Sequence, residues 1–581
     1  MTLPRMTLLR LLLALVLVAA STLGAPAARA IAQAVPTPAQ TSSASPESAA
    51  AQVDKLFEKM DTTLSPGCAL AAMKDGKIIY ERGYGMADLD HNIPITPGTV
   101  FQVGSMSKQF TAASIVMLAQ EGKLSLDDEV RKYVQEVPDF GVPITIRELV
   151  FHTSGLRDQD NLLNLAGWRV SLDLITDDDI LAVMSRQKDL NFPPSSRHLY
   201  SNTGYTLLAQ IVKRVSGQSL REFTTGRIFQ PLGMKQTHFR DDHAEIVKNI
   251  AYGYSPSKTS FRLSVPNSDS VGAGNLLTTV EDLALWDENF YHPRVGGPAM
   301  IEQMLERGKL SNGEQLDYAF GLEVGTYRGL AIVDHGGFSG GYRSDMLRFP
   351  DQHFTAVCLC NNSSRATTNP SELTRKVAEM YLAHHMKPAE TSLVGDEKTV
   401  QLSQAQLRGK VGLYLNPADN DDTRRVTLKD GKLGIDANET TALSENHFRR
   451  VNVAIDFQFE ASKPDGPLRL IETRPGISKP VVVAFEAVAE FTPSAGELKD
   501  YAGIYHSEEI DPFFEMKIEE SHLVLHRPKK SPDTLSPLSR DFFYGDIGTI
   551  RFKRDAKGQV IGFMVSTGRA NNVRFDKRDR P

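Results

Sequence analysis

The feature that most limits the fold is a long apolar segment without turn residues. Residues 106–121 contain no Pro or Gly, and their apolar side chains would cover every side of a helix. A helix of this kind has to be buried by other elements on all sides. Gly122 follows directly, as expected at a helix C-terminus. The sequence therefore predicts a domain built around a central helix.

This helix opens with Ser105-Met106-Ser107-Lys108. Ser105 and Lys108 are three residues apart and so share one helical face. A lysine in a desolvated pocket is partly neutral and can take the proton of a serine hydroxyl. The backbone N–H of a helix-opening serine also suits an oxyanion. The alternative is a serine cap with an incidental lysine, since Ser-x-x-Lys recurs at Ser255 and Lys258.

A second motif, Tyr200-Ser201-Asn202, lies between a Pro-Pro pair at 193–194 and an apolar-periodic segment at 207–212. It is therefore expected in a loop just before a helix, where side chains can point into a cleft. A tyrosine there can carry a proton to a leaving group, and an asparagine amide can hold Lys108 and a substrate carbonyl. The alternative is an asparagine cap with a tyrosine packed against it.

A third motif, His335-Gly336-Gly337, follows an apolar strand at 330–333 and precedes strands at 345–349 and 354–360. Glycines allow a strand to approach a substrate backbone closely. The alternative is a glycine-rich hairpin without chemistry.

In this order and context the three motifs resemble the serine β-lactamase and penicillin-binding protein superfamily. The nearest branch is class C β-lactamase-like, with D-aminopeptidases, D-Ala-D-Ala carboxypeptidases and related esterases. Supporting phrases occur at 149–156, 272–283 and 318–322. The resemblance implies an α+β fold with a β-lactamase/transpeptidase-like catalytic domain. Its antiparallel sheet would be flanked by helices, start with a hairpin at 67–73 and 78–83, and lie beside a helical lobe.

The resemblance also assigns a role to each motif residue. Ser105 would be the acylated nucleophile, Lys108 its general base, Tyr200 the proton shuttle and Asn202 the amide that orients Lys108 and substrate. Substrate would lie along Gly336 and Gly337, and the oxyanion hole would be the backbone N–H groups of Ser105 and Phe338.

His335-Gly336-Gly337 takes the place of the Lys-Thr-Gly triplet of the penicillin-binding group. A lysine there is a permanent cation for a substrate carboxylate, whereas a histidine is only partly charged near neutrality. Efficient β-lactamase activity is therefore not expected from this chain.

The expected function is a secreted serine hydrolase that works through an acyl-enzyme on Ser105. Its substrates would be amides or esters of small peptides, including peptidoglycan-derived ones, D-amino-acid derivatives or simple esters. One alternative is a penicillin-binding sensor or weak β-lactamase that acylates with little turnover. Another is a non-catalytic ligand-binding protein.

The first thirty residues are typical of a secretory signal peptide. Arg5 and Arg10 precede an apolar core at 11–20, and Ala28-Arg29-Ala30 is a small-x-small cleavage site. A second such site occurs at 32–34, so the sequence allows two cleavage positions a few residues apart. The core is too short to span a membrane comfortably, so no stable anchor is expected after cleavage, although an uncleaved anchor is the alternative. The expected location is secreted or periplasmic, in a bacterial-type envelope.

Changes in composition along the chain divide the rest into further regions. An Ala/Pro/Ser/Thr-rich stretch at 31–50 is expected to be a disordered spacer. The catalytic domain is placed at 51–386 and a polar linker at 387–399. Residues 400–490 and 491–581 repeat one pattern, in which Gly412-Leu413-Tyr414 and Gly503-Ile504-Tyr505 each lead to a hairpin. They resemble paired lipocalin-like barrels, with a single merged sheet as the alternative.

Cysteine usage and charge exclude several classes of partner. The three cysteines are expected to be buried, unreactive and unbridged, with Cys358 and Cys360 side by side on an apolar strand. None of the 14 histidines has a metal-type spacing, so no metal or other cofactor is expected. A net charge of −6 without a basic stripe disfavours nucleic acid. The sequence leaves the oligomeric state open.

Overall fold

The computed structural model describes residues 48–579 except 171, 389–398, 418, 437, 452–454, 462–465, 475, 477–479 and 490. The predicted signal peptide, nearly all of the predicted spacer and most of the predicted linker lie outside the described residues. The domain boundaries proposed from the sequence stay predictions. No described helix combines the length and the apolar character that crossing a bilayer requires.

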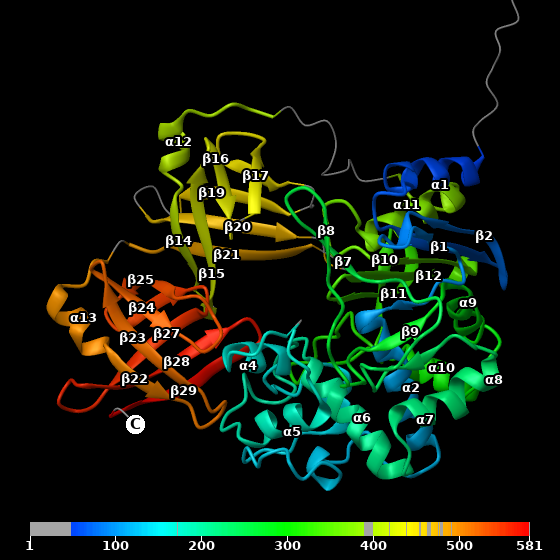
Figure 1. Cartoon of the computed structure of the whole chain (residues 1–581), viewed down its shortest axis with the longest axis horizontal. Helices are drawn as coiled ribbons and strands as arrows, with labels where there is room; N and C mark the ends of the chain where they lie inside the picture. Colours follow the sequence, from blue (N-terminus) through cyan, green and yellow to red (C-terminus); the bar gives the residue numbers. More distant parts are fainter. Residues whose placement is uncertain are drawn as a thin grey trace, which may run out of the picture. The chain divides into compact units, whose positions relative to one another are not determined.

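The catalytic domain is built on a six-stranded antiparallel sheet with the order β10-β11-β12-β13-β1-β2 (Figure 1). The strands are β10 (Glu323–Tyr327), β11 (Leu330–Ser339), β12 (Tyr342–Phe349), β13 (Phe354–Cys360), β1 (Cys68–Lys74) and β2 (Lys77–Tyr84). β1 lies between β2 and β13, so an early hairpin completes a sheet formed mainly by a later part of the chain. The predicted hairpin is present within one residue of its expected bounds.

Helices cover both faces of this sheet. On one face, α1 (Ala49–Phe57) and α11 (Pro370–Leu382) share a core with Leu70 and Ala72 of β1. On the other face, Ala69 and Ala71 pack into the larger core that includes the central helix. Side chains of a strand alternate between faces, so β1 has to be apolar along its whole length.

The predicted central helix is α2 (Lys108–Gln120), and every one of its side chains from Lys108 to Leu118 is buried. A 3₁₀ turn at Gly104–Ser107 precedes it. The remaining helices of the lobe are α3 (Ile146–Val150), α4 (Gln159–Leu165), α5 (Asp177–Ser185), α6 (Asn202–Ser216), α7 (Leu220–Thr224), α8 (Gln230–Leu232), α9 (Val280–Glu288) and α10 (Gly297–Met304). Short strands link them: β3 (Met86–Asp88), β4 (Ile93–Pro94), β5 (Phe101–Gln102), β6 (His238–Phe239), β7 (Tyr254–Pro256), β8 (Phe261–Leu263) and β9 (Leu276–Thr278).

Two closed antiparallel barrels follow, drawn from yellow to red in Figure 1. The first comprises β14 (Gly412–Asn416), β15 (Asp419–Lys429), β16 (Lys432–Ile435), β17 (Asn438–Ala442), β18 (His447–Arg450), β19 (Asp456–Ala461), β20 (Leu468–Arg474) and β21 (Val481–Ala487). The second comprises β22 (Gly503–His506), β23 (Phe513–Glu519), β24 (His522–His526), β25 (Asp533–Ser539), β26 (Phe542–Gly545), β27 (Gly548–Arg554), β28 (Val560–Thr567) and β29 (Ala570–Arg578). The α+β fold class with two separate barrels is confirmed, and the merged sheet is wrong.

The repeated sequence pattern gives the same opening structure in both barrels. A short helix precedes each, α12 (Gln404–Arg408) and α13 (Ala495–Tyr501), and each begins with a serine capping box. In the first barrel the buried Tyr414 hydroxyl donates to the Lys410 carbonyl at 2.8 Å. In the second, Tyr505 donates to the Tyr501 carbonyl at 2.7 Å. The tyrosine of the repeat is therefore structural, because its hydroxyl binds the first strand to the C-terminal end of the preceding helix or to the turn just after it.

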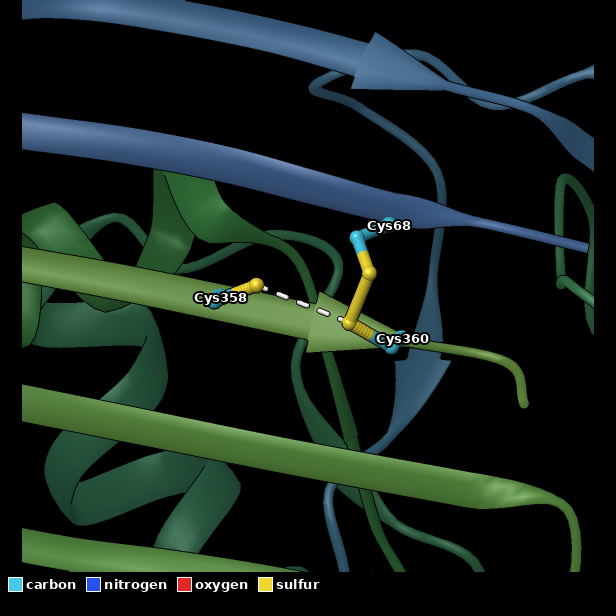
Figure 2. A group of neighbouring side chains, drawn as sticks. All are labelled: Cys68, Cys358 and Cys360. Atoms are coloured by element: carbon cyan, nitrogen blue, oxygen red, sulfur yellow. Dashed lines mark hydrogen bonds between the residues drawn. A yellow bond between two sulfur atoms is a disulfide. The ribbon is translucent and has the colours of Figure 1, made fainter. Parts of the chain in front are cut away.

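The expectation that all three cysteines are unbridged is wrong. Cys68 and Cys360 form a disulfide, with their Cα atoms 4.0 Å apart (Figure 2). The reason is the register of the sheet, in which β1 and β13 pair with Cys68 directly opposite Cys360. Cys358 is a buried free thiol whose Sγ lies 3.5 Å from Cys360 Sγ.

The second barrel is packed against the catalytic domain. Its core residues belong to the same contiguous apolar cluster as the central helix, whereas the first barrel has a core of its own. Arg157 of the catalytic domain forms a fully buried ion pair with Glu509, and it also donates to the Asn572 carbonyl at 3.0 Å. The helical lobe and the second barrel thus share one continuous hydrophobic core.

Candidate active site

Ser105 and Lys108 meet where the 3₁₀ turn changes into α2. Lys108 Nζ donates to Ser105 Oγ at 3.1 Å, to Asn202 Oδ1 at 2.9 Å and to the Ala273 carbonyl at 2.7 Å. The lysine side chain is completely buried. The three partners of Nζ come from three separate segments of the catalytic domain.

Burial determines the acid–base character of Lys108. Desolvation lowers the pKa of its ammonium from 10.5 to about 7. The nearby carboxylates of Asp158 and Asp160 oppose this change in pKa, and the Arg569 guanidinium adds to it. A large fraction of Lys108 is therefore neutral at neutral pH and able to accept a proton.

Asn202 is held in one orientation by two carboxylates. It is the first residue of α6, and its backbone N–H donates to Asp158 Oδ2 at 2.7 Å. Its side-chain Nδ2 donates to Asp160 Oδ2, also at 2.7 Å. Because the amide nitrogen points to a carboxylate, the amide oxygen has to point to Lys108.

Tyr200 lies over the lysine. Lys108 Nζ is 4.8 Å from the centroid of the Tyr200 ring, and the ring packs against His152 at 4.2 Å between centroids. Burial raises the pKa of the Tyr200 hydroxyl, and the nearby Ser105 hydroxyl partly offsets this change. Within the described residues the buried hydroxyl has no hydrogen-bond partner. It is protonated at neutral pH and available to a substrate atom.

A close backbone contact brings Ser105 next to Phe338. Gly104 has φ of +52°, and a Cβ on it would lie 2.7 Å from the Phe338 nitrogen. On β11, a Cβ on Gly337 would lie 2.0 Å from the Val103 carbonyl oxygen. Both glycines are thus required for β11 to approach the turn that carries Ser105. The contact places the two amides predicted to form the oxyanion hole on adjacent segments.

His335 is buried and has two hydrogen-bond partners. Its Nδ1–H donates to the Gly336 carbonyl at 2.6 Å, which leaves Nε2 to accept from the Tyr318 hydroxyl at 3.3 Å. Burial, helped by the charge of Lys108, lowers the pKa of His335 to about 4. The imidazole is neutral at pH 7 and supplies no cation to the site.

A cavity of about 380 Å³ opens beside Ser105. Its lining residues are Gly104, Ser105, Gln159, Asp160, Val170, Ile175, Asn202, Ser255, Ser264, Pro266, Ser268, Ser270, Ala273, Gly274, Asn275, Phe338, Ser339, Gly340 and Ser363. Asp160 is the one acidic side chain among them, and neither Lys nor Arg is present; burial and the charge of Asp158 raise the pKa of Asp160 to about 6, so it is mostly ionised at pH 7. The end of β11 and the turn after it contribute Phe338, Ser339 and Gly340 to the lining, whereas His335, Gly336 and Gly337 are not among the lining residues.

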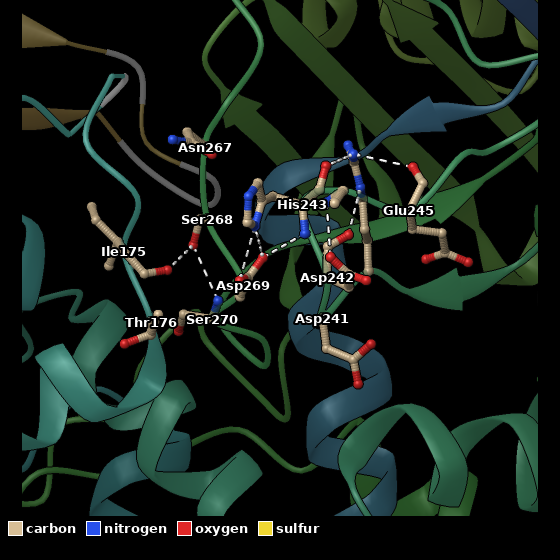
Figure 3. Close-up of polar contacts among 12 residues, drawn as sticks. Ile175, Thr176, Asp241, Asp242, His243, Glu245, Asn267, Ser268, Asp269 and Ser270 are labelled. Carbon is tan, nitrogen blue, oxygen red and sulfur yellow. Dashed lines mark hydrogen bonds and ion pairs between the residues drawn. The ribbon is translucent and has the colours of Figure 1, made fainter.

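Figure 3 shows polar contacts of Ile175, Ser268 and Ser270, which line this cavity, and of a neighbouring cluster with Asp242, His243 and Asp269. Ser268 Oγ donates to the Ile175 carbonyl at 3.2 Å and accepts from the Ser270 N–H at 3.2 Å. In the neighbouring cluster, Asp242, His243 and Asp269 place possible metal-ligand atoms within 4.8 Å of one another. His243 already uses its N–H and its Nδ1 on Asp269, so hydrogen bonding accounts for this cluster.

The duplicate motifs found in the sequence do not form second sites. Ser255 lines the cavity, but its hydroxyl accepts from Ser363 at 2.9 Å, and Lys258 lies in an exposed turn. Tyr414 belongs to the core of the first barrel.

Sequence reasoning missed four residues around Lys108: Ala273, Asp158, Asp160 and Arg569. Asp158 caps α4, accepting from the N–H groups of Asp160 and Asn161. An aspartate before a helix is a recognisable cap signal, although it does not reveal the contact with Asn202. Arg569 comes from the turn between β28 and β29, and nothing in its local sequence indicates an active-site contact.

Comparisons with known proteins agree with this geometry. The Beta-lactamase family model matches residues 53–379. Penicillin-binding protein 4* of Bacillus subtilis is 32% identical over 321 residues, which cover 53% of this chain and 70% of that protein. D-aminopeptidase of Gluconobacter oxydans is 25% identical over 452 residues, covering 77% and 80%. The solved structure of the octameric penicillin-binding protein homologue from Pyrococcus abyssi matches with a TM-score of 0.54 and 25% identity, covering 75% of this chain and 99% of that one. The chain belongs to the beta-lactamase family.

Proposed function

We propose that the protein is a serine hydrolase that cleaves amide bonds through an acyl-enzyme on Ser105. The observation that carries this proposal is the contact between Ser105 Oγ and a fully buried Lys108 whose pKa is lowered to about 7. A lysine of ordinary pKa would be an ammonium and could not act as a base at neutral pH. The similarity to a D-aminopeptidase over 77% of this chain supports amide substrates.

The residues of the site account for each proton transfer. Ser105 Oγ attacks the carbonyl carbon as its proton moves to neutral Lys108, and the oxyanion is held by the N–H groups of Ser105 and Phe338. Tyr200 gives its proton to the leaving amine and is reprotonated from Lys108. Water then attacks the carbonyl carbon of the Ser105 ester while Lys108 and Tyr200 take its proton; they return this proton to Ser105 Oγ as the ester bond breaks and the acid is released.

The charge of the cavity favours substrates with a free amino group near the scissile bond. Asp160 is the one charged side chain that lines the cavity, and His335 is neutral. A carboxylate-bearing β-lactam would find no cation among the lining residues, whereas an ammonium group could pair with Asp160. We infer that the preferred substrates are D-amino-acid amides or short peptides with a free amine.

The nucleophile is tested by covalent labelling and intact mass. Wild-type protein should gain one adduct from a fluorophosphonate, Ser105→Ala none, and Ser255→Ala one. An adduct on Ser105→Ala would refute the assignment.

Incubation with β-lactams, D-aminoacyl amides and short-chain esters then separates the function classes. Turnover of amides supports the hydrolase, a persistent β-lactam adduct without amide or ester turnover supports the sensor, and neither adduct nor turnover supports a binding protein.

The substrate preference is tested with Asp160→Asn. The variant should lose selectivity for an unblocked D-aminoacyl anilide over its N-acetylated form by about tenfold to a hundredfold, the range for a charged hydrogen bond of about 1.5–3 kcal/mol. Using the ratio of the two substrates removes any general loss caused through Asn202. Asp269→Asn removes a carboxylate that does not line this cavity, so it is the control and should leave the ratio unchanged. An unchanged ratio in Asp160→Asn would refute this role.

We also propose that the mature protein is secreted or periplasmic. The N-terminal segment has the composition of a cleaved signal peptide, and the Cys68–Cys360 disulfide supports an oxidising compartment. N-terminal sequencing of the protein from the envelope or medium should find a start shortly after Ala30 or Ala34. An intact N-terminus on the exported protein would contradict cleavage.

A further inference from the structure

The turn between β28 and β29 of the second barrel lies against the helical lobe next to Lys108. The Arg569 carbonyl accepts from the Asp158 N–H at 3.0 Å and from Asn191 Nδ2 at 2.9 Å. The neighbouring Asn571 N–H donates to Asn191 Oδ1 at 2.8 Å. Backbone and side-chain contacts therefore hold this turn in a defined place beside the site.

The Arg569 side chain extends from this turn to a carboxylate of the site. Its Nη2 donates to Asp158 Oδ1 at 2.9 Å, and its guanidinium carbon lies 5.6 Å from the centroid of the Tyr200 ring. The Asp158 side chain is fully buried, while 30% of the Arg569 side chain is exposed. The Asp158 carboxylate also accepts from the backbone N–H groups of Asp160, Asn161 and Asn202, and Arg569 supplies the one guanidinium that contacts it in the described structure.

Asp158 connects Arg569 to Lys108 through Asn202. One of its oxygens binds Arg569, and the other accepts from the Asn202 N–H at 2.7 Å. The side chain of Asn202 in turn accepts from Lys108 Nζ at 2.9 Å. A continuous series of contacts therefore leads from the second barrel to Lys108.

We propose that Arg569 is a positioning residue of the Ser105 site, supplied by the second barrel, which neutralises Asp158 and thereby keeps Asn202 and Lys108 in the arrangement for proton transfer. This inference rests on the proposed function, because it assumes that Lys108 is the base. It gives the second barrel a part in the reaction without any contact between Arg569 and substrate.

The direction of the expected effect follows from the charges around Lys108. Arg569 lowers the pKa of Lys108, and Asp158 and Asp160 raise it. The other titratable groups that face the lysine are uncharged at neutral pH: Tyr200, Tyr205, His152 and His335. Removing the Arg569 charge leaves two carboxylates to stabilise the ammonium, so the pKa of Lys108 should rise.

The test is the pH profile of kcat/KM for the full chain acting on a D-aminoacyl anilide. In Arg569→Met the rising limb should move to higher pH by about half a unit to one unit, and the rate at pH 7 should fall. Arg569→Lys keeps the charge and should restore most of the limb's position. Arg578→Met removes an exposed arginine of the same barrel and should leave the limb in place.

A double variant keeps the test decisive if the unpaired Asp158 impairs folding. Arg569→Met/Asp158→Asn removes both charges, so the limb should return toward the wild-type position and the two changes should not be additive. An unmoved limb in Arg569→Met, or an equal movement in Arg578→Met, would overturn the role of Arg569. Loss of turnover in Ser105→Ala together with an unmoved limb refutes only this role. Retained turnover in Ser105→Ala refutes the proposed function instead.

Discussion

At the scale of single residues, the protonation state of Lys108 sets the working pH. Its pKa is lowered to about 7, so the fraction of neutral lysine rises as pH increases from 6 to 8. We expect kcat/KM to rise over this interval with an apparent pKa near 7. A pH series with an uncharged ester, whose own ionisation does not change, measures this. A rising limb near pH 10 would mean that Lys108 is an ordinary ammonium.

Removing either proton carrier should slow the reaction without unfolding the protein. Lys108→Met and Tyr200→Phe should each lower kcat by about 10²–10⁴, the usual range for general acid–base groups. Circular dichroism and thermal unfolding serve as the control for folding. His152 is not a substitute base, because its Nδ1 accepts from the Ser201 N–H and burial lowers its pKa well below the usual value. Near-normal turnover in Lys108→Met would refute the lysine mechanism.

The sequence could predict which motif residues meet, and it could not predict their environment. Ser105 and Lys108 are one helical turn apart, so their contact follows from local geometry. Asp160 and Arg569 reach the same place through tertiary contacts between distant segments, and no local pattern indicates such contacts.

At the scale of elements, the disulfide joins β1 and β13, which are the first and the last strands of the central sheet along the chain. Its cysteines are 292 residues apart, so it restricts the unfolded chain strongly. Reduction, or the change Cys68→Ala, should lower the free energy of unfolding by about 2–4 kcal/mol. Chemical denaturation with and without reductant measures this. Cys358→Ala is the control, and it should keep the disulfide and the response to reductant. Equal stability with and without reductant would contradict the bridge.

The strands of the central sheet show which pairings can be predicted from the sequence and which cannot. Turn residues Asp75 and Gly76 between two strands predicted the first hairpin, because a hairpin is local. The pairing of β1 with β13 is not local, and only their register places Cys68 opposite Cys360. An apolar strand with alternating cysteines is equally compatible with packing and with a cross-strand bridge.

At the scale of the whole molecule, a buried ion pair joins the second barrel to the helical lobe. The side chains of Arg157 and Glu509 are 0% and 2% exposed. Glu509→Ala would leave a buried guanidinium without its carboxylate, so we expect a loss of about 3–5 kcal/mol in the free energy of unfolding. Lys376→Ala breaks an exposed pair with Glu372 and should cost less than about 1 kcal/mol. Equal, small losses in both variants would contradict an integral interface.

The repeat around Tyr414 and Tyr505 predicts two similar units with local hairpins, but it does not decide between two barrels and one merged sheet, because each barrel closes by pairing its first strand with its last. The docking of the second barrel depends on complementary surfaces, and a single sequence carries no pattern for these. The repeated unit and its hairpins can therefore be predicted from the sequence, whereas the contribution of Arg569 to the site cannot.

The contact between Arg569 and Asp158 also has a consequence for how the protein is made. The ribosome adds Arg569 after every other residue that surrounds Lys108, and the hairpin that carries it closes the second barrel. Until that hairpin has folded and docked, the Asp158 carboxylate lacks its cation. Ser105 is therefore synthesised early, whereas the Arg569 guanidinium reaches Asp158 only at the end. A chain that lacks the last hairpin, because it is unfinished or has been cleaved, differs from the complete chain in the charges around Lys108.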